Sequence, residues 1–227
     1  MFYYYGRKKQ IAKRYPRPEY SAVVEPFAGA ASYSLYADNW RSDVTLIEKD
    51  ERVADIWRWL INDATPSQIL SLPDLKVGER STEFLHIIHA ATKMAFKYKR
   101  IKVTPVLERN WEISKRVMAA SVHKVKHWSI IHGDYTLAED LEATWFIDPP
   151  YKASSGEGYA YGSSQINYSE LASWVRSRRG QVICCEGIAG DYLPFTPLLD
   201  MPGVAGKISK ELIYHRFDQQ PSQGTLL

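Results

Sequence analysis

Short apolar runs alternate with amphipathic stretches along the first quarter of the chain. Each apolar run is rich in β-branched residues and ends at an acidic residue, which is typical of a buried strand. Apolar residues at helical spacing follow each run and predict a helix that packs one face on a sheet. The expected elements are strands at residues 21–25 and 44–47 and helices at residues 30–36 and 51–60. This order predicts an α/β fold with a mostly parallel sheet and right-handed crossovers.

A long helical block interrupts this alternation. From residue 81 to about residue 128 the apolar residues recur at helical spacing, and no strand-like alternation of useful length occurs. Such a block is too long for a single crossover, so we expect an inserted, mainly helical subdomain at residues 66–127. Residues 1–65 and 128–227 then form the main domain. The block has no Asn-Gly or Asp-Gly pair of the kind that marks a tight β-hairpin.

Strand signals resume after the helical block. We expect strands at residues 128–131, 144–147 and 181–185, each followed closely by an acidic residue. A helix is expected between the last two strands, at residues 168–178. A final strand is expected at residues 208–215, antiparallel to its neighbour and at the edge of the sheet.

The composition is that of an ordinary globular protein, with 45% hydrophobic and 24% charged residues in a chain of 227. This length allows one domain with a small insertion. Cys184 and Cys185 are adjacent in an apolar run, so we expect buried thiols, no disulfide framework and a reducing, cytoplasmic setting. No run approaches the roughly 20 apolar residues that span a bilayer, and the N-terminus lacks a signal peptide, so no membrane partner is expected.

The net charge of +3 conceals a strong asymmetry along the chain. Residues 1–20 carry a net charge of +5 and residues 93–126 carry +8, so the remainder sums to −10. Two basic segments on an otherwise acidic chain favour a polyanionic partner. Two solvated helix faces would have the same composition, and charge alone does not separate these interpretations.

The tetrapeptide Asp148-Pro149-Pro150-Tyr151 follows the apolar run at residues 143–147. Its two prolines remove two backbone donors and stiffen the turn, which leaves carbonyls that only accept hydrogen bonds. Asp148 adds a carboxylate acceptor, and Tyr151 adds an aromatic face. These groups suit a flat ring that carries an amino group.

Four acidic residues fall where predicted parallel strands end: Glu25, Glu48, Asp134 and Asp148. Ligands of open α/β sheets bind at this edge. Any one of these acids alone is best explained as a helix cap or a solvated turn residue. Together they predict a ligand site, and Glu48 is placed to accept hydrogen bonds from ribose hydroxyls, which indicates a nucleoside-containing cofactor.

These motifs, in this order, resemble those of the Dam-like DNA adenine-N6 methyltransferases. The resemblance rests on Tyr5-Gly6-Arg7-Lys8, Glu25-Pro26-Phe27-Ala28-Gly29, Asp134 and Asp148-Pro149-Pro150-Tyr151. The family usually has a second glycine where this chain has Ala31. The resemblance implies a Rossmann-like, mostly parallel sheet that binds S-adenosylmethionine, with a DNA-recognition insertion before the catalytic motif.

The resemblance also assigns site residues. Those implied for the cofactor are Tyr5, Gly6, Lys8, Glu25, Pro26, Phe27, Ala28, Gly29, Glu48, Asp134 and Asp148. Those implied for catalysis are Asp148, Pro149, Pro150 and Tyr151. In the basic helical block, phosphate contacts are expected from Lys97, Lys99, Arg100 and Lys102, with affinity that falls steeply with salt.

The expected reaction is methyl transfer to N6 of an adenine flipped out of duplex DNA. The Asp148 carboxylate and the Pro149 carbonyl would accept the two amino hydrogens, and Tyr151 would stack on the base. The same geometry suits cytosine N4 or an RNA adenine, and a catalytically silent protein that binds cofactor and DNA is a further alternative. The expected setting is the cytoplasm of a bacterial or phage-infected cell.

No metal site is expected. His123 and His127 lie four residues apart on a predicted helix, but no third ligand motif accompanies them.

Overall fold

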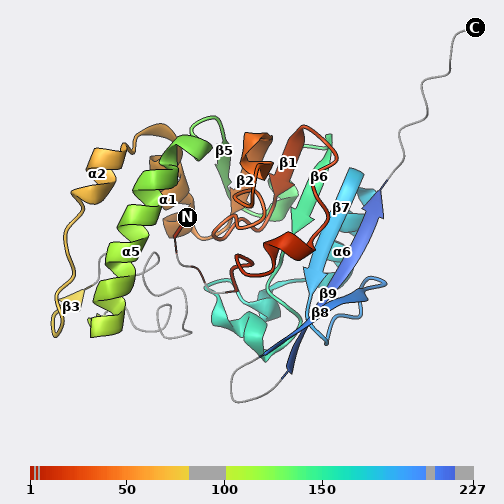
Figure 1. The fold of residues 1–227 in the computed structure, drawn as a ribbon. Helices are drawn as coiled ribbons and strands as arrows, with labels where there is room; N and C mark the ends of the chain where they lie inside the picture. Colours follow the sequence, from red (N-terminus) through yellow and green to blue (C-terminus); the bar gives the residue numbers. More distant parts are fainter. Residues whose placement is uncertain (3, 5, 82–100, 203–207, 218–227) are drawn as a thin grey trace, which may run out of the picture.

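The computed structural model describes residues 1–2, 4, 6–81, 101–202 and 208–217. Its centre is a seven-stranded sheet with the spatial order β5-β2-β1-β6-β7-β9-β8 (Figure 1). The strands are β1 (Ala22–Glu25), β2 (Asp43–Glu48), β5 (Ser129–His132), β6 (Glu142–Ile147), β7 (Arg179–Glu186), β8 (Thr196–Pro202) and β9 (Ile208–Phe217). The first five strands in this spatial order are parallel, and β9 runs antiparallel to both β7 and β8. The fold is therefore α/β with a mostly parallel, mixed sheet.

The helices α1 and α6 cover opposite faces of the large sheet, and a small antiparallel pair forms a separate sheet. The helices are α1 (Glu51–Asn62), α2 (Pro66–Leu70), α5 (Pro105–Ser121) and α6 (Tyr168–Ser177). The short 3-10 helices are η1 (Ala12–Arg14), η2 (Asn39–Arg41), η3 (Val122–Val125), η4 (Tyr135–Leu137), η5 (Ser154–Gly158) and η6 (Ser163–Gln165). The antiparallel pair is β3 (Arg80–Ser81) with β4 (Ile101–Lys102). No helix in the described part of the chain has the length and apolarity needed to cross a membrane.

Side-chain caps explain where the main helices begin. The carboxylate of Asp50 accepts from the backbone N–H of Arg52 at the start of α1. Thr65 and Gln68 form a reciprocal capping box at α2, and Asn167 caps α6. The predicted strands at residues 21–25, 44–47, 128–131, 144–147 and 181–185 and the helices at 51–60 and 168–178 are confirmed within a few residues.

The helix predicted at residues 30–36 is wrong, because this segment forms a series of turns. Gly29, just before this segment, and Ala31 within it have φ values of 46° and 45°. This left-handed conformation does not occur within an α-helix. The Glu25 carboxylate accepts from the Ser34 N–H at 2.8 Å, so the turns are tied to the end of β1. The positive φ of Ala31 is a conformation that glycine adopts without strain.

The last strand is antiparallel as predicted, but its predicted place at the edge of the sheet is wrong. β9 lies between β7 and β8, and β8 forms the edge. Pro197 and Pro202 lie in β8 and lack the backbone N–H that a residue of an inner strand donates to a neighbouring strand. These prolines obscure β8 as a strand in the sequence, and they also explain why it occupies the edge.

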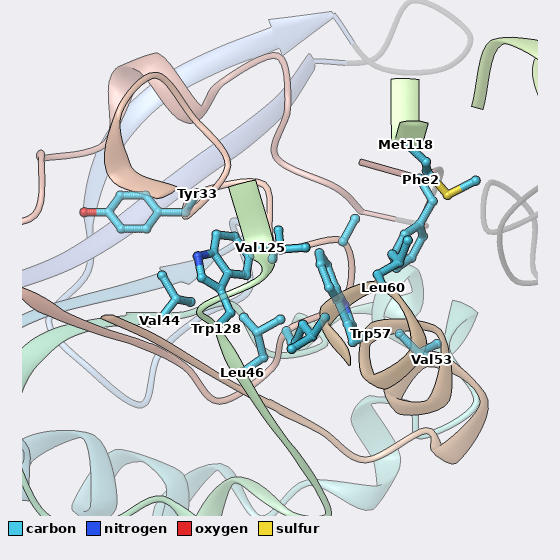
Figure 2. Close-up of a cluster of buried hydrophobic side chains, with 14 of the residues drawn as sticks. Phe2, Tyr33, Val44, Leu46, Val53, Trp57, Leu60, Met118, Val125 and Trp128 are labelled. Carbon is cyan, nitrogen blue, oxygen red and sulfur yellow. The ribbon is translucent and has the colours of Figure 1, made fainter. Parts of the chain in front are cut away.

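Successive side chains along the strands point to opposite faces of the sheet and belong to two separate hydrophobic cores, one on each face. Val23 and Leu46 belong to the first core, which packs against α1 and the region of η3. Figure 2 shows Trp57 and Trp128 in this core, close to Leu46. Val24 and its neighbours on the other face pack against α6. Each fully buried aliphatic side chain contributes about 1.5–3 kcal/mol to the free energy of folding. Because such side chains occur on both faces, packing stabilises the strands from both sides.

The described part of residues 66–127 is mainly helical. α2 and α5 pack together, and the Trp111 indole N–H donates to the Pro73 carbonyl at 2.7 Å. The buried Lys115 ammonium lies 2.5 Å from the Asp74 carboxylate and also donates to the Leu72 carbonyl. Residues 82–100 of the predicted helical block lie outside the described residues.

Candidate functional site

A cavity of about 250 Å³ lies where β1, β2, β5 and β6 end. Its walls include seven residues that the sequence assigned to the site: Pro26, Phe27, Gly29, Glu48, Asp134, Asp148 and Pro150. A smaller cavity of about 30 Å³ adjoins it, and the two share Phe27, Gly29 and Asp148. Gly6, Lys8, Glu25 and Ala28 line this smaller cavity. The predicted cluster of strand-end residues is therefore a single concave region.

Asp148 forms an ion pair with a lysine from the N-terminal segment. The Lys8 ammonium lies 2.7 Å from the Asp148 carboxylate and also donates to the Gly6 carbonyl at 3.2 Å. Burial raises the pKa of Asp148 to about 6, although Lys8 opposes this shift. Burial lowers the pKa of Lys8, but the combined attraction of Asp148, Glu211 and other neighbouring groups raises this pKa overall. Lys8 therefore stays charged and favours the ionised carboxylate near neutral pH.

Tyr151 is fixed by a buried carboxylate from the far end of the chain. Its hydroxyl donates to Glu211 Oε1 at 2.5 Å, and the Tyr15 hydroxyl donates to the same oxygen at 2.6 Å. The Lys8 ammonium lies 4.6 Å from the centre of the Tyr151 ring. Tyr151 and Pro149 are not among the residues that line either cavity. The predicted stacking of Tyr151 on a base therefore stays a prediction.

The neighbouring Pro150 faces the larger cavity, and its carbonyl accepts from the Tyr168 hydroxyl at 2.7 Å. Tyr168 is the first residue of α6, so this bond ties the tetrapeptide to that helix. The turn after β6 is thus held on both sides, through Pro150 and through Tyr151.

Glu48 joins the loop after β1 to the start of α1. Its two carboxylate oxygens accept from the N–H groups of Gly29 and Asp50, each at 2.9 Å. Each oxygen retains a second acceptor site. Burial raises the pKa of Glu48 to about 7, although these hydrogen bonds oppose the shift. A Cβ on Gly29 would lie 2.9 Å from the Tyr4 ring, so this position requires glycine.

Asp134, beyond β5, is the most exposed of the four acids. Burial alone would raise the pKa of Asp134. The Lys49 ammonium at 3.0 Å and the hydrogen bond from the Thr136 N–H together outweigh this effect, so the pKa is depressed. Next to it the rings of Phe27 and Tyr135 stack with their centres 5.3 Å apart. This end of the cavity combines an ionised acceptor with apolar aromatic faces.

Glu25 is buried beside the smaller cavity, and burial raises its pKa to about 8. Between pH 4.5 and pH 8 the folded state holds a proton that the unfolded state has lost. The free energy of unfolding is therefore expected to fall as pH rises through this window, by at most about 1.4 kcal/mol per pH unit from this group. Glu25→Gln keeps an acceptor for the Ser34 N–H and is expected to flatten the slope.

Urea unfolding at pH 6 and pH 8 measures this effect. The exposed residue Glu19 provides the matched control, because Glu19→Gln makes the same chemical change on the surface. An unchanged slope in Glu25→Gln would show that Glu25 does not hold a proton in the folded protein.

Several predicted residues lie away from the cavities or cannot be placed. Tyr5, Lys97, Lys99 and Arg100 lie outside the described residues. Lys102 is exposed on β4 and lines neither cavity.

The two histidines and two cysteines considered in the sequence line neither cavity. His127 contacts the Ser42 carbonyl at 3.2 Å, and both His123 and His127 lie near the Trp40 ring. In the described ranges no three potential metal ligands gather. Cys184 and Cys185 are buried as predicted, and burial raises the pKa of both thiols.

Some residues of the site were missed in the sequence. Tyr159 and Tyr161 line the larger cavity and, together with Tyr4 from the aromatic start of the chain, supply its aromatic faces. Glu211 lies in the strand predicted at residues 208–215, but no role was predicted for it. The signal that could have found it is that Glu211 shares a strand face with the apolar Ile213, since a buried carboxylate needs hydrogen-bond donors.

Comparisons with known proteins leave the family open. Neither a scan against protein-family models nor a search of curated proteins found a match to this chain.

Proposed function

We propose that this protein transfers a methyl group from S-adenosylmethionine to N6 of adenine in duplex DNA, as a Dam-like enzyme. The observation that carries the proposal is the position of Asp148. The first residue of the tetrapeptide lines both cavities at the carboxyl ends of the parallel strands. The acids expected to hold the cofactor line the same two cavities.

The strand order supports a Rossmann-like sheet. Numbering the strands of the large sheet along the chain gives the spatial order 3-2-1-4-5-7-6. The doubly wound nucleotide-binding order is 3-2-1-4-5-6, so this sheet differs by one antiparallel strand inserted near an edge. In this proposal residues 1–65 and 128–227 form the cofactor-binding domain, and residues 66–127 form the insertion that reads DNA.

The residues around the cavity fit the chemistry of S-adenosylmethionine. Glu48 retains acceptor sites for ribose hydroxyls, and Phe27 with Tyr135 offers apolar faces for an adenine near Asp134. Glu25 and Ala28 line the smaller cavity, where the methionine portion is expected. The larger cavity alone, at about 250 Å³, lies just below the range of about 300–1,000 Å³ common for ligand pockets.

Bound S-adenosylmethionine supplies an electrophilic methyl group on a sulfonium. The chain contributes orientation and electrostatics. The Asp148 carboxylate, which lines both cavities, accepts one amino hydrogen of the base, and by the resemblance the Pro149 carbonyl accepts the other, which localises the nitrogen lone pair for attack. Lys8 keeps the Asp148 carboxylate ionised, and the proton leaves after the nitrogen has become cationic. Asp148 therefore acts as an oriented acceptor rather than as a strong base.

Methyl transfer to DNA tests the proposal directly. The purified protein is mixed with methyl-labelled S-adenosylmethionine and unmethylated duplex DNA, and the product is digested to nucleosides. We expect the label in N6-methyl-2′-deoxyadenosine. Label in N4-methylcytosine or only in RNA would favour the alternative substrates. Cofactor and DNA binding without any transfer would identify a catalytically silent protein and reject the enzyme.

A further inference from the structure

A third cavity, of about 260 Å³, lies between the N-terminal segment and the end of α5. Three cationic side chains line it: Arg7, Lys9 and Lys124. The hydroxyl-bearing residues Ser32 and Ser121 lie in the same wall. No aspartate or glutamate occurs among the described residues that form it. We call this cavity the basic concavity.

Packing in the core holds the two sides of the basic concavity together. Phe2 lies in the buried cluster with its ring centre 5.3 Å from that of Trp57, and Figure 2 shows it beside Met118 of α5. The N-terminal segment is therefore anchored against α5. On the other side, the Lys124 ammonium lies 5.6 Å from the centre of the Trp40 ring, which fixes its direction. Arg7 and Lys9 are neighbours in the sequence, and the fold brings Lys124 to them.

The electrostatics of the basic concavity agree with this placement. The pKa of the Met1 amino group is lowered to about 5, first by burial and then by repulsion from Lys9, Arg7 and Lys124. All three cations therefore lie close enough to the Met1 amino group to lower its pKa. Gathering like charges costs energy, which an anion in the concavity would relieve.

The basic concavity adjoins the proposed catalytic site. Arg7 and Ser32 line it and also line the small cavity that includes Asp148. An anion bound there would lie beside the place where the target base is held. In a DNA strand, the anionic groups next to each base are the phosphates of the same nucleotide and its neighbour. Cationic and hydroxyl side chains are the groups that bind such phosphates.

We propose that the basic concavity binds a backbone phosphate of the DNA strand that carries the target adenine. This inference rests on the proposed function, and it assigns strand positioning to Lys9 and Lys124, outside the segment at residues 97–102. Arg7 contributes to the same contact from the shared wall. Phosphate contacts fix the register of the strand without reading its sequence.

The test measures duplex DNA affinity across salt concentrations for the full chain. The double variant Lys9→Gln/Lys124→Gln removes two cations from the concavity. The control Lys13→Gln/Lys210→Gln removes two exposed lysines that do not line it. We expect about tenfold weaker binding for the first variant and a slope of log K against log salt that is smaller by about one. The control is expected to change both quantities by less than half as much.

The outcomes separate this inference from the proposed function. Equal losses in both variants would overturn the phosphate site, whether or not the wild type transfers methyl groups. Tighter binding of single-stranded RNA than of duplex DNA by the wild type would also overturn it. A wild type without methyl transfer whose DNA affinity still depends on Lys9 and Lys124 would reject the proposed reaction and support the DNA contact. Unchanged cofactor affinity in the double variant shows that the fold is intact.

Discussion

Replacing Asp148 by alanine is expected to lower kcat for methyl transfer by about 100- to 1,000-fold, the range found when one oriented hydrogen-bond partner is removed from a transition state. The carboxylate lies in the wall of both cavities and is the group that would fix the amino nitrogen. Its loss also leaves the buried Lys8 ammonium without its partner at 2.7 Å. Single-turnover transfer of labelled methyl groups to DNA measures the effect.

A second variant and a control separate catalysis from folding. Asp148→Asn keeps one carbonyl acceptor and the side-chain volume, and we expect a smaller loss than in Asp148→Ala. Asp63→Ala changes an exposed aspartate at the far end of α1 and is expected to leave kcat unchanged. Wild-type kcat in Asp148→Ala would refute the role of this carboxylate in the reaction.

Replacing Glu48 by alanine is expected to weaken S-adenosylmethionine binding by about 10- to 100-fold, because hydrogen bonds to a charged acceptor contribute about 1.5–3 kcal/mol. Glu48 also holds the N–H groups of Gly29 and Asp50, so its removal loosens the wall of the cavity. Calorimetric titration of the cofactor measures the affinity. Glu51→Ala, at an exposed position three residues away, is the matched control.

The pH dependence of binding tests the same residue independently. The pKa of Glu48 is about 7 in the free protein. If ribose hydroxyls prefer the ionised carboxylate, binding releases its proton, so affinity rises from pH 6 towards pH 8 and then levels off. Glu48→Gln keeps the shape but does not titrate and is expected to show no such rise. A wild-type affinity that does not change over this range would contradict the assignment.

The clustering of the four acids could be predicted from the sequence because it depends only on the direction of the parallel strands. Strands in a parallel sheet end at one edge, so Glu25, Glu48, Asp134 and Asp148 had to meet once the strands were recognised. The same reasoning located the loop that includes Gly29.

The errors arise where tertiary contacts override local pattern. Residues 30–36 have helical spacing, but the left-handed conformation of Ala31 and the bond from Ser34 to Glu25 favour turns. The role of Glu211 could not be inferred locally, since Tyr15 is 196 residues away from it in the chain. Contacts of such separation follow from the sheet order, which the prolines of β8 concealed.

The position of β9 determines when the proposed active site is completed. This strand inserts between β7 and β8 and carries the carboxylate that binds Tyr15 and Tyr151. Every residue from η1 to β9 must therefore be synthesised before that network closes, and contacts over such a span form slowly. A nascent chain that stops before β9 would contain every recognisable motif and still lack the acceptor that fixes Tyr151. The hydrogen bonds of Tyr15 and Tyr151 to Glu211 therefore cannot form until the C-terminal strand has been synthesised.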